Sequence, residues 1–132
     1  MKVVADSHAL VWFTQGSPQL SPRAAEVLRQ AEAGDGITVS VATLIDLWYV
    51  TQTTQGVSAR ELSELRGLVM ATSAVDLHPV DVAVADAYTA ISRELLSDPW
   101  DRFIVATALV LRVPLVTRDR GIQRSGLVET VW

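Results

Sequence analysis

Four aspartates stand at positions where their carboxylates could share one chemical task. Asp6 directly follows the apolar run VVA, and Asp119 closes the segment LVTRD. Asp101 lies in DPWDR, just before a long apolar stretch, and Asp46 lies inside ATLIDLWYV. If these carboxylates met, each pair about 4 Å apart would repel by about 4 kcal/mol at an effective dielectric constant of about 20, so a cation would have to lie among them. All-oxygen ligands suit Mg²⁺ or Mn²⁺, and carboxylate-held ions of this kind serve phosphoryl chemistry.

Most of these acids also have a purely structural explanation. Asp6 could cap a helix, and Asp119 could be an ordinary turn residue. Asp101 could lie in the first turn of a helix, where a negative charge interacts favourably with the helix dipole. Asp46 is harder to explain, because aspartate suits a helix interior poorly and its neighbours are apolar. A carboxylate buried there needs a cation, a strong hydrogen-bond partner or a site, and a buried ion pair with an arginine is the structural alternative.

Other metal-binding side chains are scarce in this chain. There is no cysteine, and His8 and His78 are the two histidines, so a zinc site is disfavoured. The C-terminal third is locally basic, since residues 99–132 carry five arginines against three acids. Arginines near the acids could attract a polyanion, and the candidates are Arg102, Arg118 and Arg120. Solvated surface arginines are the alternative interpretation.

The elements that must position these residues alternate along the chain. Apolar, β-branched runs predict strands, and helices are predicted between them from capping residues and helical spacing of apolar residues. The predicted strands lie within residues 2–5, 37–41, 75–80, 113–117 and 127–132. The predicted helices lie within residues 8–14, 23–33, 42–53, 58–72, 82–95 and 97–112. This alternation predicts an α/β domain with a mainly parallel sheet, whose ligands bind beyond the carboxyl ends of the strands.

Composition narrows the class of protein. The 132 residues fit one domain, and the apolar fraction of 49% is sufficient for a core. A net charge of −4 disfavours a protein that coats nucleic acid in general. No apolar run reaches the roughly 18 residues of a membrane span, and the short apolar N-terminal stretch ends in a charge, unlike a signal peptide. We therefore expect no membrane association and a cytoplasmic location.

Three other enzyme and signalling classes fit poorly. A receiver domain needs a lysine after its last strands, and the sole lysine is Lys2. The chain lacks both the G-x-x-x-x-G-K-[ST] run of P-loop NTPases and the G-x-S-x-G run of serine hydrolases.

Four segments together resemble the motifs of PIN-domain nucleases, specifically the VapC-type toxins of toxin–antitoxin pairs. VVADSHALVWF resembles the opening strand, acid and short helix, and SVATLIDLWYV the second motif, with a hydroxyl residue three positions before an acid. DPWDRFIVATAL and LVTRD resemble the third and fourth motifs. The resemblance covers essentially the whole chain. The residues that match the family motifs are Asp6, Thr43, Asp46, Asp101, Thr117 and Asp119.

The resemblance implies a single PIN domain over residues 1–132, with a three-layer α/β/α fold and a Mg²⁺-dependent endoribonuclease activity, Mn²⁺ being an alternative ion. By analogy, water attacks the RNA backbone and leaves a 5′-phosphate and a 3′-hydroxyl. The metal ligands would be Asp6, Asp101 and Asp119. Asp46 would orient or activate the water, with support from Thr117 and Thr43. From their charge and their proximity to the acids, the candidate contacts to RNA phosphates are Arg102, Arg118 and Arg120. The family also implies a small antitoxin that blocks the site, and a homodimer.

Two departures from the family pattern matter. The second acid is usually glutamate, and Asp46 is one methylene shorter, so either the backbone comes closer or the contact runs through water. This departure keeps open a second function, a weakly active or inactive PIN-like domain that binds RNA or protein. DPWD also offers two acids, and we predict that Asp98 caps the helix while Asp101 belongs to the site, with Asp98 as an additional candidate carboxylate.

Overall fold

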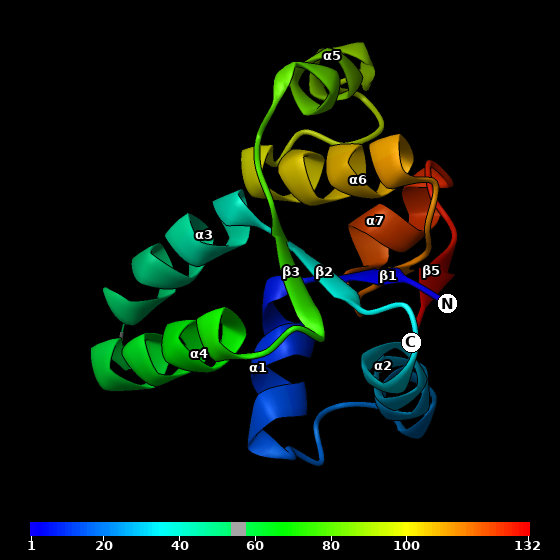
Figure 1. Cartoon of the computed structure of the whole chain (residues 1–132). Coiled ribbons are helices and arrows are strands. Elements are labelled where there is room, and N and C mark those ends of the chain that lie inside the picture. Colours follow the sequence, from blue (N-terminus) through cyan, green and yellow to red (C-terminus); the bar gives the residue numbers. More distant parts are fainter. Residues whose placement is uncertain (54–57) are drawn as a thin grey trace.

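The computed structural model of the chain describes residues 1–53 and 58–132, and its strands form one parallel sheet. The strand order is β3-β2-β1-β4-β5, and all four neighbouring pairs run parallel (Figure 1). The strands are β1 (Val3–Ala5), β2 (Ile37–Ser40), β3 (Val75–His78), β4 (Leu115–Val116) and β5 (Thr130–Val131). The predicted mainly parallel sheet is therefore confirmed.

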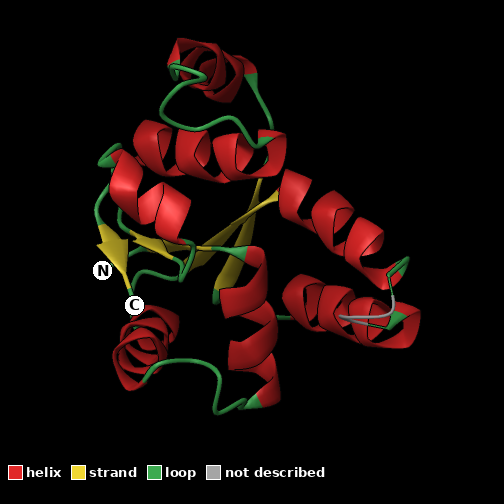
Figure 2. Cartoon of the chain, turned by 180° about the vertical axis from the view of Figure 1, so that it is seen from behind, coloured by secondary structure: helices red, strands yellow, loops and turns green. Residues whose placement is uncertain are grey.

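Helices cover both faces of this sheet, which gives the expected three layers. They are α1 (Ser7–Gln15), α2 (Pro22–Ala33), α3 (Val41–Thr51), α4 (Ala59–Ala71), α5 (Val82–Ala90), α6 (Pro99–Leu111) and α7 (Arg120–Ser125). The helices α5, α6 and α7 lie on one side, and α1, α2 and α4 on the other (Figures 1 and 2). The helix α3 leaves the end of β2 and runs beside α4 past the sheet edge. Among the described residues, no helix is long and apolar enough to span a membrane.

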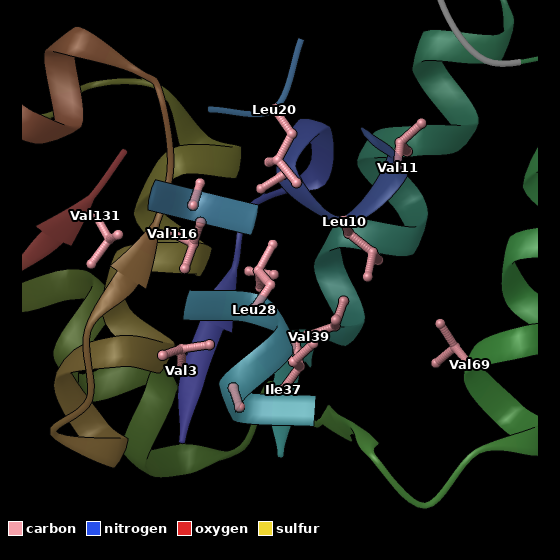
Figure 3. Packing of buried hydrophobic residues seen from close by; sticks show 14 of the residues in the cluster. Val3, Leu10, Val11, Leu20, Leu28, Ile37, Val39, Val69, Val116 and Val131 are labelled. Atoms are coloured by element: carbon pink, nitrogen blue, oxygen red, sulfur yellow. The ribbon is translucent and has the colours of Figure 1, made fainter. Parts of the chain in front are cut away.

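The central strand shows how the two faces are filled. Successive side chains of a strand point to opposite faces, so Val3 and Ala5 pack into one cluster while Val4 packs into the other. The first cluster joins the sheet to α1, α2 and α4, with Leu10 and Leu28 fully buried (Figure 3). The second joins it to α5, α6 and α7. Burial on both faces makes the sheet a fixed platform for the residues that follow its strands.

Two helix starts follow the sequence signals, whereas one helix end and one whole helix differ from the prediction. The N-caps Ser21 and Asp98, each followed by proline, stand where predicted. The helix predicted over residues 82–95 ends at Ala90, where Ile91 turns to extended backbone. A further helix, α7, lies between the last two strands, where no helix was predicted, and Asp119 caps it. Both differences involve side chains that satisfy backbone groups, which hydrophobic periodicity does not report.

Candidate active site

The predicted acids meet beyond the carboxyl ends of β1 and β4. These neighbouring strands lie where the sheet order changes direction, the usual place for a ligand site in an open parallel sheet. Asp6 follows β1, whereas Thr117 and Asp119 follow β4. A pocket of about 240 Å³ opens there. It is lined by Asp6, Ser7, His8, Ala9, Asp46, Asp101, Arg118 and Asp119.

Asp6 is held by hydrogen bonds on both carboxylate oxygens. Its Oδ1 accepts from the backbone N–H of Ser7 as the cap of α1, and its Oδ2 accepts from the Thr117 hydroxyl at 2.5 Å. Burial raises the pKa of Asp6, and these two hydrogen bonds oppose the rise. Thr117 is fully buried and its hydroxyl contacts the first acid, while its role as a supporting residue of the site stays a prediction.

Asp46 is fixed by a neighbour that the sequence analysis did not assign to the site. The buried Ser7 hydroxyl donates to Asp46 Oδ2 at 2.9 Å, linking the first turn of α1 to the middle of α3. Burial raises the pKa of Asp46, and the Ser7 hydrogen bond opposes this rise. In the described part of the chain, the other oxygen of Asp46 receives no hydrogen bond, so it remains available to a ligand of the pocket.

In the part of the chain that the structure describes, the Thr43 hydroxyl makes no hydrogen bond to the second acid, so the supporting role suggested by the family motif stays a prediction. It is 1% exposed, and within residues 1–53 and 58–132 its hydroxyl has no hydrogen-bond partner. Ser7 provides the hydroxyl contact to the second acid instead. The signal that could have indicated this was the position of Ser7 directly after Asp6, at the mouth of the predicted site.

Asp101 sits in the first turn of α6, as predicted from DPWDR. Asp98 caps this helix through Oδ1, which accepts from the backbone N–H groups of Trp100 at 2.9 Å and Asp101 at 3.0 Å. The prediction that Asp98 is the cap is confirmed. Because Asp98 is exposed and absent from the pocket lining, Asp101 is the carboxylate that α6 contributes to the site.

The carboxyl group of Asp101 is strongly perturbed by its surroundings. Its pKa is raised from 3.8 to about 7, with burial as the main cause. The remaining rise comes from four negative neighbours, in decreasing order Asp119, Asp98, Asp6 and Asp46. Mutual repulsion of this kind is what a bound divalent cation would relieve.

Asp119 connects the end of β4 to the helix that follows. Its Oδ1 caps α7 by accepting from the backbone N–H of Ile122 at 2.8 Å, and its own N–H donates to the Thr117 hydroxyl at 3.1 Å. Thr117 thereby links Asp6 and Asp119, the two acids that follow neighbouring strands. A ligand of the pocket would meet both acids in fixed relative positions.

The donor set fits a hard divalent cation that keeps part of its water. Apart from the Ser7 hydroxyl and the His8 imidazole, the side chains of the pocket lining that could ligate a metal are carboxylates. Within the described residues, no three His, Asp or Glu side chains are already arranged so that they could hold a metal ion. Mg²⁺ is commonly held by one or two carboxylates while several waters stay bound. Asp6, Asp101 and Asp119 would hold such an ion, with water completing its shell.

Of the three arginines predicted to contact RNA, the structure contradicts one. Arg102 is 6% exposed, and its guanidinium donates to three backbone carbonyls, those of Leu96, Tyr88 and Ile91. The prediction for Arg102 is therefore wrong, because its charge is turned into the core. Arg118 is exposed and lines the pocket. Arg120 is exposed at the start of α7 and stays a prediction.

Comparison with known proteins settles the family. The family model described as PIN domain matches residues 3–126. The chain belongs to the PIN-domain family. This PIN domain is also 30% identical to Ribonuclease VapC22 from Mycobacterium tuberculosis (strain ATCC 25618 / H37Rv), and the match covers 98% of each chain. The predicted resemblance to VapC-type members is thereby confirmed.

Solved structures share the fold of this PIN domain. VapBC2 from Rickettsia felis, bound to a DNA fragment from the promoter, has a chain that superposes with a TM-score of 0.72 at 15% identity, covering 98% of this chain and 97% of that one. VapBC-1 from nontypeable Haemophilus influenzae gives a TM-score of 0.71 at 18% identity, covering 98% and 96%. At these identities the likeness concerns the fold alone.

Proposed function

We propose that this PIN domain is a divalent-metal-dependent endoribonuclease and the toxin of a VapBC-type pair. The observation that carries the proposal is the convergence of Asp6, Asp46, Asp101 and Asp119 on one pocket. Burial, and after it repulsion by the neighbouring acids, raises the pKa of Asp101, and a bound cation would relieve that repulsion. The relative VapC22, named a ribonuclease, supports RNA as the substrate.

The side chains of this chain divide the work of phosphodiester hydrolysis. A bound Mg²⁺ or Mn²⁺ supplies polarisation of the phosphate and activation of a water molecule. Thr117 keeps Asp6 and Asp119 in place, and Ser7 keeps Asp46 in place through one oxygen, so that the other oxygen can accept a proton from water. Arg118 attracts the phosphate at the rim of an otherwise acidic pocket.

The partner that this proposal implies is a small antitoxin protein in the cytoplasm. Helix α3 exposes Ile45 at 50%, Trp48 at 50% and Tyr49 at 52%, and an apolar groove of about 630 Å³ runs between α3 and α4. Exposed apolar surface of this kind suits a protein partner. Structural neighbours solved as VapBC complexes support an antitoxin. The homodimer expected from the resemblance stays a prediction.

The direct test is RNA cleavage by protein purified without antitoxin. Single-stranded RNA is incubated with Mg²⁺, with Mn²⁺, or with EDTA, and the product ends are mapped. We expect cleavage with either ion, none with EDTA, and 5′-phosphate ends. Equal cleavage in EDTA would exclude the metal-dependent mechanism, and stable RNA binding without cleavage would favour the alternative of a binding module.

Asp46 offers a matched pair of substitutions that separates these two functions. Asp46→Asn removes a proton acceptor and should lower kcat by about 100-fold, the lower end of the usual contribution of a general base. Asp46→Glu, which restores the usual family residue, should keep or raise the cleavage rate. Both are measured as initial rates on the same RNA. Loss of activity in Asp46→Glu would mean that the shorter side chain is part of the site geometry.

Ser7 should control the pH dependence of cleavage. Its hydroxyl lowers the pKa of Asp46, so Ser7→Ala raises that pKa and moves the acidic limb of the pH–rate profile to higher pH. Rates well above that limb should change little, because Asp46 is deprotonated there in both proteins. Ser63→Ala, an exposed serine on α4, is the matched control. An unmoved limb would show that Asp46 is not the group that titrates.

A further inference from the structure

Among the described residues, the Arg118 guanidinium forms no ion pair, although it lies close to several carboxylates. It lines the same pocket as Asp6, Asp101 and Asp119. A guanidinium on a flexible side chain beside such a cluster would ordinarily close onto one of the acids. Some other contact therefore determines where this guanidinium lies.

That contact is the ring of Trp12. The Arg118 Cζ lies 4.9 Å from the centroid of the Trp12 ring, within the range of a cation–π interaction. An exposed ion pair and an exposed cation–π contact stabilise a protein by similar amounts. The tryptophan can therefore decide the position of the guanidinium, even with acids close by.

Trp12 is itself held from several sides. It packs on the core that joins the sheet to α1 and α2, and its ring lies 6.0 Å from that of Trp132 and 5.4 Å from that of His8. Trp132 directly follows β5, which pairs with β4, the strand that leads to Arg118. The ring and the backbone of Arg118 are thus both tied to the same edge of the sheet.

We infer that Trp12 is a positioning residue for RNA binding, which holds the Arg118 guanidinium off the carboxylates and presents it to a substrate phosphate. This inference rests on the proposed ribonuclease function. It extends that function to a residue outside the acidic motifs and assigns it a role through Arg118. Without the ring, Arg118 would pair with an acid of the pocket, and both the phosphate contact and a carboxylate would be lost.

A double-mutant cycle tests the inference. Wild type, Trp12→Ala, Arg118→Ala and the double variant are titrated into a short fluorescein-labelled single-stranded RNA of mixed sequence, in EDTA to prevent cleavage, at several KCl concentrations. We expect each single variant to bind about three- to tenfold more weakly, as loss of one cation–π-held contact predicts, and to lower the salt slope by about one. The double variant should bind no more weakly than Arg118→Ala, because Trp12 acts through Arg118.

Two further variants separate positioning from folding. Trp12→Phe keeps an aromatic face and should bind like wild type, while Arg118→Lys keeps the charge but loses planar stacking and should bind more weakly. Thermal unfolding of each variant shows whether the fold survives. Should Trp12→Ala be too unstable to use, the wild-type affinity of Trp12→Phe together with weakened Arg118→Lys supports the inference, and equal binding by Arg118→Lys and wild type overturns it.

The outcomes distinguish this inference from the proposed function. Additive losses in the cycle, or an unchanged salt slope in Trp12→Ala, overturn the role of Trp12 even when wild type cleaves RNA with Mg²⁺. Wild type that binds RNA but does not cleave it overturns the nuclease proposal, and the cycle still decides the role of Trp12. If wild type neither binds nor cleaves RNA, both proposals are wrong.

Discussion

Asp101→Asn is expected to abolish RNA cleavage and to stabilise the metal-free protein at neutral pH. The side chain keeps its shape but loses the negative charge that α6 brings to the pocket. Mutating a residue that only hydrogen-bonds to a metal ligand typically lowers activity about 10–100-fold. Loss of the ligand itself should therefore lower the cleavage rate by roughly 100-fold or more. Initial rates with Mg²⁺ measure the first effect, and urea unfolding in EDTA measures the second.

The stability effect follows from the raised pKa of Asp101. The folded protein keeps this proton up to about pH 7, whereas the unfolded chain releases it near the ordinary value of 3.8. Between these values the folded state binds more protons, so the ionised Asp101 increasingly destabilises the wild-type fold as the pH rises. Asparagine carries no such charge. The stability gained by Asp101→Asn should therefore be absent near pH 4, grow toward pH 7, and stay constant above.

Asp86→Asn provides the matched control, since Asp86 is exposed on α5 away from the pocket. It should change neither the cleavage rate nor the pH dependence of unfolding. Cleavage by Asp101→Asn at the wild-type rate would remove Asp101 from the metal ligands. A stability gain that is the same at pH 4 and pH 8 would show that Asp101 is not held protonated by its surroundings.

The fold could be predicted from sequence because its signals are local and strong. Apolar β-branched runs marked each strand, and serine or aspartate before proline marked the starts of α2 and α6. The end of α5 and the presence of α7 could not be predicted in this way. The first depends on the Arg102 guanidinium, which binds carbonyls at Tyr88 and Ile91, and the second on one aspartate that caps a short helix.

The site was predictable where a residue type has few alternatives. A carboxylate inside an apolar helix, such as Asp46, has few other uses, and the structure brings it to one pocket with Asp6, which also caps a helix. Hydroxyl and guanidinium groups are less specific. Ser7, rather than Thr43, proved to contact the second acid, because that choice depends on how α1 and α3 pack.

Arg102→Met is expected to destabilise the protein by about 3–5 kcal/mol, because a buried acceptor left without a donor costs about 1–3 kcal/mol and three carbonyls lose this donor. The guanidinium donates to Leu96 O and Tyr88 O at 2.7 Å and to Ile91 O at 2.9 Å, and its Cζ lies 4.7 Å from the Tyr88 ring centroid. Methionine fills similar space without donors, so these carbonyls would lose the guanidinium as their hydrogen-bond donor. Urea unfolding measures the change, with Arg23→Met on the surface of α2 as the control.

The burial of Arg102 explains why DPWDR carries opposite charges before an apolar helix. Neighbouring residues of a helix point about 100° apart, so the first turn of α6 sends Asp101 to the pocket and Arg102 into the core. Anchoring by Arg102 then fixes the backbone that carries Asp101. At a temperature where Arg102→Met is folded, we expect its RNA affinity to keep the wild-type salt slope while kcat falls. Wild-type stability with a reduced salt slope would instead show that Arg102 contacts RNA directly.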